Sequence, residues 1–397
     1  MDYLSRRLEA VINETRLRQK SILLLGPRQT GKTTLLKRLP LDLSVTLAQP
    51  TVRRRYERHP GELTGEIEVL ARSLGRPPLV VLDEVQKVPE LLDAAQDLID
   101  RDIAQFILTG SSARKLRTGK HVNLLPGRVV SLRLDALTCM EIPPDLHLLP
   151  QLLNDGSLPA ILTEPSAQYR DTDLQSYVSI YLEDEIRAEA LVRQVPAFAH
   201  FLMLAAAESG KLVHLRKLSQ EIGVAHTTIA NYYQILEDCL IAERVPPFVH
   251  TATRRRLSQA SKYLFFDLGV RRLAANECIA STDQQYGHLL EQWVGLELIR
   301  EARLAKLRTR IYYWRDLNGP EVDWVIDQAG VHIPVEVKWT EHPSTSDTRH
   351  LQLFLSEYPT ATKGFLVCRI PRPMQLTEQV TAIPWHSIYA AIFMDML

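Results

Sequence analysis

The stretch GPRQTGKTT at residues 26–34 constrains this chain more than any other, because it follows the apolar run SILLL and opens an apparent helix. It matches the pattern GxxxxGK(S/T). Between a strand and a helix, the backbone amides of such a loop bind phosphates, its lysine reaches the β- and γ-phosphate oxygens, and its hydroxyl holds magnesium. The residues expected to bind ATP are Gly26, Gly31, Lys32, Thr33 and Thr34, of which Thr33 also coordinates Mg²⁺.

Two later apolar runs end in polar residues that suit hydrolysis. LVVLDE ends in Asp83 and Glu84, and FILTGSS ends in small hydroxyl residues. We assign Asp83 to the magnesium ion and Glu84 to the base that activates the attacking water. Ser111 is the first choice for a sensor that hydrogen-bonds the γ-phosphate or that water, and Thr109 is the second. Together with Lys32, these residues predict an ATP-hydrolysing enzyme.

An arginine is expected to stabilise the charge that develops on the transferred phosphoryl group. Where a neighbouring subunit supplies it, turnover rises by about 10³ to 10⁵ fold. The candidates are Arg114 and Arg128, and Arg128 is the one assigned to catalysis because it follows a turn at Gly127 just before a strand. This assignment implies a homo-oligomer with the arginine acting in trans. The alternative for Arg128 is a surface role.

Charge and cysteine content exclude several classes of protein. Lys plus Arg and Asp plus Glu both number 47, so no overall field attracts the chain to nucleic acid or acidic lipid, and any polyanion site is local. The four cysteines lie far apart and form no CxxC pair, which argues against a disulfide scaffold or zinc cluster. The beginning of the chain lacks the apolar stretch of a signal peptide, and no run approaches about 18 apolar residues. We therefore expect a cytoplasmic protein without membrane contact.

The pattern of apolar runs indicates an α/β fold with several domains. Between Ser21 and about Leu134 the runs are short, hydrophobic throughout and separated by helix-length segments, as in a parallel sheet covered on both faces. The predicted order is a P-loop ATPase domain at 1–134, a helical lid subdomain at 135–197, a winged-helix domain at 198–266 and a second α/β domain at 267–397.

Three helices followed by apolar extended runs indicate the winged helix. The apolar residues between Ile229 and Leu240 in the third helix follow helical spacing and define its buried face. DNA is the expected partner, and a protein-docking or structural winged helix is the alternative. The residues expected to contact nucleic acid are Asn231 and Gln234 on the outward face and Arg254, Arg255 and Arg256 between the wing strands.

The segment EVDWVIDQAGVHIPVEVK places Asp323 on one strand and Glu336 with Lys338 on one face of the next. Glu291, on the helix before them, is turned towards the core, where a carboxylate is costly unless it is paired or liganded. Carboxylates can bind magnesium and the lysine can activate water. The four residues resemble a PD-(D/E)XK nuclease core with the three acids as metal ligands. The alternative is a nuclease-like fold that binds DNA without cutting, or whose acids form an ion-pair network with Lys338.

The chain as a whole resembles a widespread prokaryotic family of AAA-type ATPases that carry a C-terminal domain of unknown function. The segments that carry the resemblance include LLLGPRQTGKTTLLKRL, VVLDEVQKVPELL, ILTGSSARKL, LPGRVVSLRLDALT, GSLPAIL, YYWRDLNGPEVDWVI and PVEVK. The resemblance implies an AAA-type ATPase domain with a helical lid, a central winged helix and a C-terminal nuclease-like α/β domain. One departure is Ala48, where family members often have an acid, so any role of that acid does not carry over.

Three functions are compatible with these residues. The first is an ATP-driven enzyme that acts on DNA as a DNA-stimulated translocase or remodeller, including of branched DNA. The second is an ATP-dependent oligomeric switch that binds a protein partner, and the third is an ATP-regulated, metal-dependent nuclease. Stimulation of ATP hydrolysis by DNA distinguishes the first function from the second.

Overall fold

The computed structural model describes residues 3–110, 127–182, 195–249, 260–305, 308–316 and 319–394. The chain divides into two compact units. The first unit contains the chain up to Asp135 together with Asp238–Ile241, and the second contains Ala136–Glu237 and Ala242–Leu397. Each unit has a sheet of its own.

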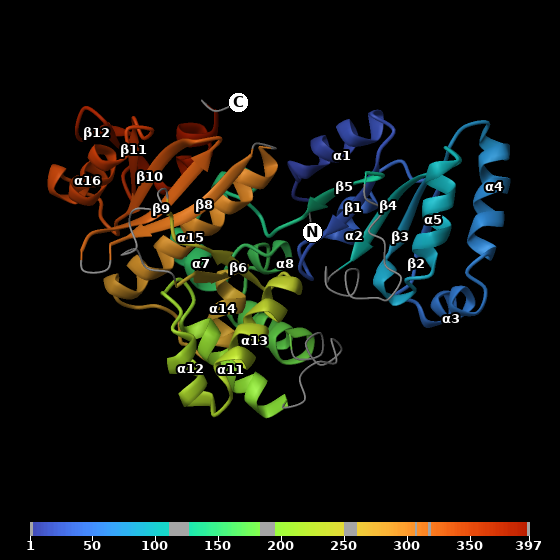
Figure 1. Ribbon diagram of the computed structural model, residues 1–397, viewed down its shortest axis with the longest axis horizontal. Helices are drawn as coiled ribbons and strands as arrows, with labels where there is room; N and C mark the ends of the chain where they lie inside the picture. The colour runs from blue at the N-terminus through green and yellow to red at the C-terminus, as the bar shows by residue number, and fades with distance from the viewer. Residues whose placement is uncertain are drawn as a thin grey trace. The chain divides into compact units, whose positions relative to one another are not determined.

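A five-stranded sheet forms the centre of the first unit (Figure 1). Its strand order is β2–β3–β4–β1–β5 and every neighbouring pair is parallel, which confirms the expected parallel α/β fold. The strands are β1 (Ser21–Leu25), β2 (Leu43–Thr46), β3 (Leu79–Asp83), β4 (Gln105–Gly110) and β5 (Val129–Arg133).

The strands β1 and β3 are buried along their whole length, which explains their uninterrupted apolar sequences. They flank β4, so the residues that follow these three strands meet at one edge of the sheet. Figure 1 shows α4 and α5 beside β2 and β3, where Leu63 and Leu98 join the apolar core of the unit. The helices are α1 (Leu8–Leu17), α2 (Lys32–Leu36), α3 (Pro50–Arg58), α4 (Glu62–Leu74), α5 (Leu91–Asp100) and the 3₁₀ turn η1 (Val85–Lys87).

The second unit contains a six-stranded mixed sheet and a two-stranded ribbon. The sheet order is β12–β13–β11–β10–β9–β8, in which β8, β9 and β10 pair antiparallel and β10, β11 and β13 pair parallel. The aromatic residues Trp314, Phe354 and Tyr358 are part of its core. The strands are β6 (Ala242–Val245), β7 (Lys262–Phe265), β8 (Thr309–Arg315), β9 (Glu321–Gln328), β10 (Val331–Val337), β11 (Gly364–Cys368), β12 (Met374–Gln375) and β13 (Val380–Pro384).

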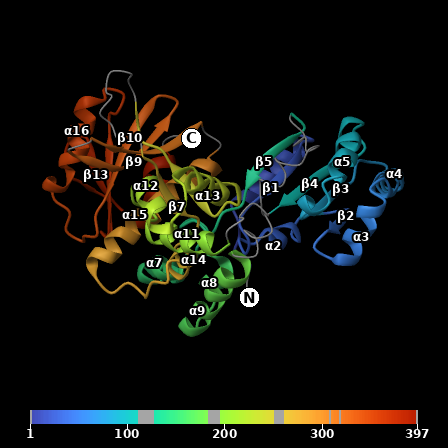
Figure 2. The ribbon, with the colours of Figure 1, turned by 60° about the horizontal axis from the view of Figure 1, so that its bottom comes forward.

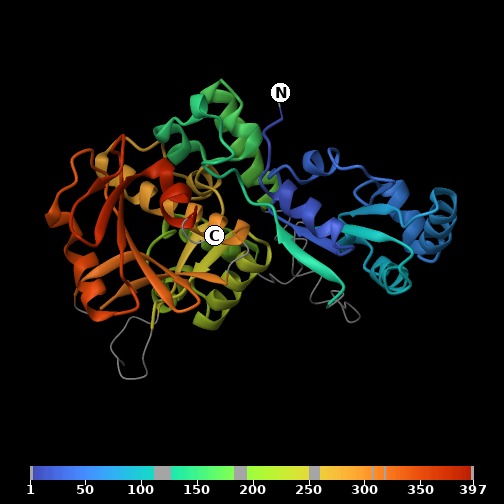
Figure 3. The ribbon, with the colours of Figure 1, turned by 90° about the horizontal axis from the view of Figure 1, so that it is seen from above.

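Helices before and around this sheet complete the second unit (Figure 2). In Figure 3 the green helices α7–α9 lie against the orange α14, with which α7 and α9 make contact. The helices are α7 (Leu149–Asp155), α8 (Pro159–Leu162), α9 (Ala167–Ser176), α11 (Val195–Ala207), α12 (Leu215–Ile222), α13 (His226–Asp238), α14 (Leu268–Ala274), α15 (Asp283–Leu304) and α16 (Arg349–Glu357). The shorter helical turns are η2 (Pro144–Leu146), η3 (Tyr177–Leu182), η4 (Thr345–Thr348), η5 (Trp385–Ser387) and η6 (Tyr389–Phe393).

The helices α11, α12 and α13 are followed by the antiparallel ribbon β6–β7, which is the element order that the sequence predicts. On α13 the side chains of Ile229, Tyr232 and Leu236 are buried, as the helical spacing indicates. The ring of Tyr233 stacks on that of Tyr263 in β7, with 4.1 Å between centroids. This contact fixes α13 to the ribbon. None of the helices in the described ranges is both long and apolar enough to cross a membrane.

Candidate functional site

The loop between β1 and α2 brings a buried cation to the edge of the parallel sheet. Gly31 adopts a φ of 95°, in the left-handed region that favours glycine, and α2 begins at Lys32. The Lys32 ammonium group donates hydrogen bonds to the carbonyl oxygens of Gly26 at 2.6 Å and Pro27 at 2.8 Å. Thr33 and Thr34 are exposed. The loop therefore offers a cation and an accessible hydroxyl, which is the donor set that a magnesium–triphosphate complex needs.

Two contacts anchor this loop to the end of β5. A Cβ atom at Gly26 would lie 2.4 Å from the carbonyl oxygen of Leu134, so only glycine fits there. Arg6, which is buried, donates from Nη1 to the Thr30 carbonyl at 2.6 Å and from Nη2 to the Asp135 carbonyl at 2.8 Å. The sequence analysis missed Arg6, because nothing in its polar surroundings distinguishes it from the other arginines near the beginning of the chain.

Thr109 on β4 forms hydrogen bonds with both acids at the end of β3, Asp83 and Glu84. Its hydroxyl donates to Asp83 Oδ1 at 2.6 Å and accepts the N–H of Glu84 at 3.1 Å. Glu84 has a φ of 62°, which is uncommon for a residue other than glycine, and the bond to Thr109 supports that backbone conformation. The Gln86 side-chain amide donates to Glu84 Oε2. In this structure Thr109 orients Asp83 and Glu84, whereas Ser111, the preferred sensor, lies outside the described residues.

Arg128 forms an ion pair within its own unit. Its Nε and Nη2 lie 2.5 and 2.9 Å from the carboxylate oxygens of Asp100, at the end of α5. The hydrogen bond from Arg128 lowers the pKa of Asp100. Arg114, the other candidate for an arginine acting in trans, lies outside the described residues.

A second group of acids lies on the mixed sheet. Asp323 on β9 adjoins the paired residues Trp324 and Val335, and its Oδ2 accepts the N–H of Val337 at 2.8 Å. Glu336 Oε1 accepts a hydrogen bond from the Lys338 ammonium group at 2.7 Å. Glu336 Oε2 is buried and has no hydrogen-bond partner among the described residues.

Burial makes this pair of acids resist ionisation. Burial, followed by the charges of Glu336 and Glu291, raises the pKa of Asp323 well above its usual value. Burial also raises the pKa of Glu336, although Lys338 opposes the effect. A divalent cation would offset the cost of ionising these two buried acids and would bind the carboxylate oxygen of Glu336 that has no hydrogen-bond partner among the described residues. Mg²⁺ is commonly held by one or two carboxylates with water molecules.

Glu291 on α15 differs from the expectation that it joins this pair as a metal ligand. Its Oε1 lies 2.9 Å from the ammonium group of Lys262 on β7, which also lies 3.1 Å from Glu321 Oε1. Within the described ranges, no three His, Cys, Asp or Glu side chains are arranged to hold a metal ion. The predicted three-acid set is thus reduced to Asp323 and Glu336, because a lysine from the ribbon engages the third acid.

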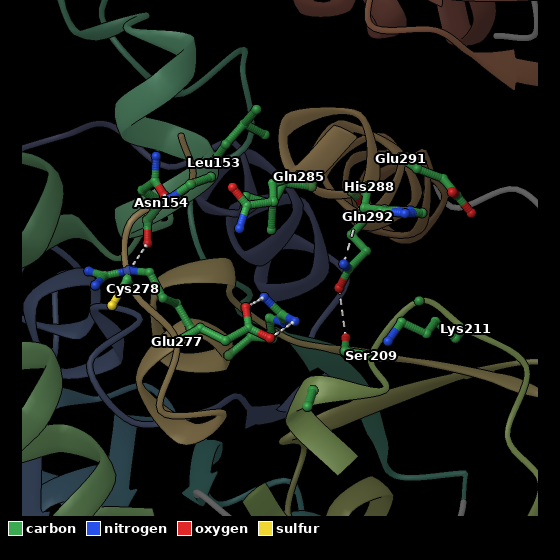
Figure 4. A pocket seen from close by; sticks show the side chains of 16 residues that line it. Leu153, Asn154, Ser209, Lys211, Glu277, Cys278, Gln285, His288, Glu291 and Gln292 are labelled. Carbon is green, nitrogen blue, oxygen red and sulfur yellow. Dashed lines mark hydrogen bonds and ion pairs between the residues drawn. The ribbon is translucent and has the colours of Figure 1, made fainter. Parts of the chain in front are cut away.

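A cavity of about 200 Å³ lies between α14, α15 and the segment 209–211 (Figure 4). The Ser209 hydroxyl donates to Gln292 Oε1 at 2.8 Å. Glu291 is among the lining residues, and Figure 4 shows it beside His288 on α15. Glu291 is therefore both a lining residue of this cavity and a partner of Lys262.

Of the residues predicted to contact nucleic acid, the structure describes those on α13 but not the three arginines between the wing strands. Asn231 and Gln234 are exposed on α13. Arg254, Arg255 and Arg256 lie outside the described residues. A groove of about 500 Å³ beside β6, β8 and α15 is lined by three further arginines, which the sequence analysis missed because they are far apart in the chain. They are Arg244, Arg303 and Arg310.

Three family models match successive parts of the chain. Residues 18–142 match an AAA domain, residues 146–277 match a domain of unknown function (DUF8612), and residues 286–388 match another domain of unknown function (DUF4143). The first match contains the Lys32 loop, Asp83, Glu84 and Thr109. These matches support an AAA-type ATPase family.

Two mycobacterial proteins are similar to the chain over most of its length. They are the "Uncharacterized protein Rv2008c" of Mycobacterium tuberculosis and the "Uncharacterized protein Mb2031c" of Mycobacterium bovis. Each is 29% identical over 392 residues, which cover 95% of this chain and 82% of the relative.

Solved structures overlap with this one only loosely. Cdc6p from Pyrobaculum aerophilum is 12% identical with a TM-score of 0.28, over 74% of this chain and 96% of that protein. The Pif1 helicase from Candida albicans is 16% identical with a TM-score of 0.23, over 44% of this chain and 54% of that protein. Similarity at this level carries no argument about fold or function.

Proposed function

We propose that the chain is an ATP-hydrolysing AAA-type protein that acts on DNA as a DNA-stimulated translocase or remodeller. The observation that carries the ATPase part is the Thr109 hydroxyl, which donates a hydrogen bond to Asp83 and accepts the backbone N–H of Glu84, at the edge of the sheet where the Lys32 loop also lies. A phosphate-binding cation follows β1, and a metal-binding acid and a general base lie at the end of β3, on either side of the Thr109 strand β4. This is the set that phosphoryl transfer to water requires.

Each residue has a distinct role in this proposal. Lys32 binds the β- and γ-phosphate oxygens in place of the Gly26 and Pro27 carbonyls that it now contacts. Thr33 and Asp83 would hold Mg²⁺, which when bound neutralises part of the phosphate charge. Glu84 takes the proton of the attacking water, and Gln86 fixes the direction of the Glu84 carboxylate.

The DNA part of the proposal rests on the second unit. Asn231 and Gln234 are exposed on α13, and the groove beside the ribbon carries three arginines, although the chain has no net charge. Local basic surfaces bind phosphates and exposed amide side chains suit base edges. We assign the domains as a P-loop domain at 1–134, a lid at 135–197, a winged helix at 198–266 and a nuclease-like domain at 267–397.

Nucleotide binding and hydrolysis test the first part. Calorimetry of Lys32→Ala should show loss of Mg–ATP binding, whereas Glu84→Gln should bind Mg–ATP and hydrolyse it about 10² to 10⁴ fold more slowly. Lys37→Ala, which alters an exposed lysine after α2, is the matched control and should resemble the wild type. If the wild-type protein has no measurable affinity for Mg–ATP, the proposal fails.

The rate of hydrolysis with forked, four-way, single-stranded and duplex DNA tests the second part. Stimulation by DNA, strongest with branched DNA, is the expected result. Hydrolysis that is unchanged by every DNA would instead favour the oligomeric switch that binds a protein partner.

The acids on the mixed sheet favour a metal-dependent nuclease as a second candidate. Asp323, Glu336 and Lys338 lie together, and one oxygen of Glu336 has no hydrogen-bond partner among the residues described. Incubation with the same DNA molecules and Mg²⁺ or Mn²⁺ tests cleavage. Glu336→Ala should abolish cutting and spare ATP hydrolysis, whereas an absence of products from the wild type leaves DNA binding alone.

A further inference from the structure

The ammonium group of Lys262 is enclosed by opposite charges and aromatic rings. Only 3% of this side chain is exposed. Its Nζ lies 2.9 Å from Glu291 and 3.1 Å from Glu321, and 5.3 Å from the ring centroids of both Tyr313 and Trp324. Carboxylates and ring faces both attract cations. The β6–β7 ribbon thus places a fixed monovalent cation beside four acids, which we call the acid cluster: Glu291, Glu321, Asp323 and Glu336.

This enclosure divides the acids into two pairs. Glu291 and Glu321 form ion pairs with Lys262, whereas Asp323 accepts the N–H of Val337 and Glu336 accepts a hydrogen bond from Lys338. Burial disfavours the charged ammonium group, but Glu291, Asp323 and Glu321 outweigh burial and raise the pKa of Lys262. The lysine therefore remains charged at neutral pH.

We propose that Lys262 takes the place of a divalent cation at the Glu291 side of the cluster, so that the cluster binds one divalent cation, at Asp323 and Glu336. The ammonium group sets both the number of ions and the affinity for the ion that binds. This inference rests on the second candidate of the proposed function, the metal site at Asp323 and Glu336, and adds how many ions that site binds and which residue sets the number.

Electrostatics gives the direction of the effect. A cation that approaches Asp323 is repelled by the Lys262 charge, and the repulsion is strong where protein replaces water. If the lysine is removed, Glu321 keeps its ion pair with Arg315 at 3.3 Å, whereas the Glu291 carboxylate loses its ion pair with Lys262 and becomes available as an oxygen ligand. Glu291 lines the cavity in Figure 4 and 22% of its side chain is exposed, so small hydrated ions can reach it.

Titration of the full-length protein with Mn²⁺, without nucleotide, tests the proposal. Calorimetry and the electron paramagnetic resonance signal of free Mn²⁺ together report affinity and number of ions. The wild type should bind one ion at the cluster, and Asp323→Asn should lose it. Lys262→Met should bind Mn²⁺ about tenfold or more tightly, or bind a second ion. Lys217→Met, which removes an exposed lysine of α12 outside the cavity, is the control and should match the wild type.

Two further variants keep the test valid if Lys262→Met fails to fold. Lys262→Met combined with Glu321→Gln preserves the net charge and still frees Glu291, so it should show a smaller gain than Lys262→Met alone. Its rise in melting temperature on Mn²⁺ addition should still exceed that of the wild type. Glu291→Gln retains Lys262 and should keep the single ion within about tenfold in affinity. The proposal is overturned if Glu291→Gln abolishes binding, if the wild type binds two ions that Asp323→Asn removes, or if the folded Lys262 variants bind Mn²⁺ as the wild type does.

Discussion

The Thr109 hydroxyl illustrates how one atom can control two functional groups. It is fully buried, donates to Asp83 and accepts from the backbone of Glu84. An acid that acts on a metal ion or a water molecule must be held within a fraction of an ångström of its working position. Thr109 is therefore expected to matter for the rate of hydrolysis more than for nucleotide affinity.

Thr109→Val removes both hydrogen bonds while it preserves the shape of the side chain. We expect hydrolysis to slow by about 10² fold, because Asp83 and Glu84 lose their common support, with Mg–ATP affinity changed by less than about threefold. Steady-state kinetics and calorimetry check this. Thr15→Val is the matched control, since among the described residues the buried Thr15 hydroxyl donates to the Val11 carbonyl of its own helix and to no catalytic group. Equal rates for Thr109→Val and the wild type would contradict the role assigned to the hydroxyl.

Arg6 holds the backbone of the phosphate-binding loop through hydrogen bonds to carbonyl oxygens. Its two hydrogen bonds link the Thr30 carbonyl to the Asp135 carbonyl, and a lysine has no fork of donors with which to make both. We expect Arg6→Lys to weaken Mg–ATP binding by about tenfold, the equivalent of one lost charge-assisted hydrogen bond. Calorimetry measures the change, and Arg18→Lys at an exposed position after α1 should have none. Unchanged affinity in Arg6→Lys would show that the loop needs no such anchor.

The helix α15 carries an unusual density of buried charge. Glu297 is buried, with its Oε1 accepting the Cys139 N–H at 2.8 Å, and Arg300 and Glu301 on the same helix are buried as well. Burial, followed by the charge of Glu301, raises the pKa of Glu297 to about 8. Arg300 and the Cys139 N–H oppose the shift, and Glu141 adds to it. The helix is therefore most stable when Glu297 holds its proton.

This shift predicts how stability depends on pH. In the unfolded chain Glu297 loses its proton near its ordinary pKa of 4.5, whereas the folded chain keeps it up to about pH 8. Since the folded state binds more protons in this window, the free energy of unfolding should fall as pH rises from about 4.5 to about 8. Glu297→Gln, which is neutral at every pH, should flatten that decline. Urea denaturation at several pH values measures it, and a decline of equal slope in both proteins would refute the assignment.

Arg128 connects the nucleotide site with the proposed assembly of subunits. In one subunit its guanidinium group is held by Asp100, so action on the γ-phosphate of a neighbour requires that it exchange this partner. Arg128→Ala should bind Mg–ATP normally and hydrolyse it about 10³ fold more slowly. Asp100→Asn, which removes only the intramolecular partner, should retain hydrolysis.

Mixed oligomers show whether the arginine acts in trans. Arg128→Ala subunits keep Glu84, and Glu84→Gln subunits keep Arg128, so an interface between them contains one complete site. Titrating one inactive variant into the other should restore part of the wild-type rate, as measured by phosphate release. If no mixture exceeds the activity of its components, the arginine acts within its own subunit or not at all.

Much of the fold could be predicted because it depends on local patterns. The apolar runs that became β1, β3, β4 and β5 are continuous in sequence, and β1, β3 and all but the first residue of β4 are buried, so composition alone identifies them. The strands β12 and β13 were not predicted, since β12 has only two residues and β13 is an ordinary short apolar run near the end of the chain. A strand of that kind is recognised only by its partner, which for β13 is β11.

The sequence alone determined the chemistry available to this protein: a glycine-rich loop with Lys32, an acidic pair after β3, and alternating acids on β9 and β10. These depend on spacings of a few residues, which the backbone geometry of strands and tight loops translates directly into position. Only the tertiary structure decided which distant groups control them. Thr109 reaches Asp83 across 26 residues, Arg6 reaches Thr30 across 24, and Lys262 reaches Glu291 across 29. Such contacts depend on how strands and helices pack against one another. Because the contacting residues have no regular spacing in the sequence, the sequence alone does not identify them as partners.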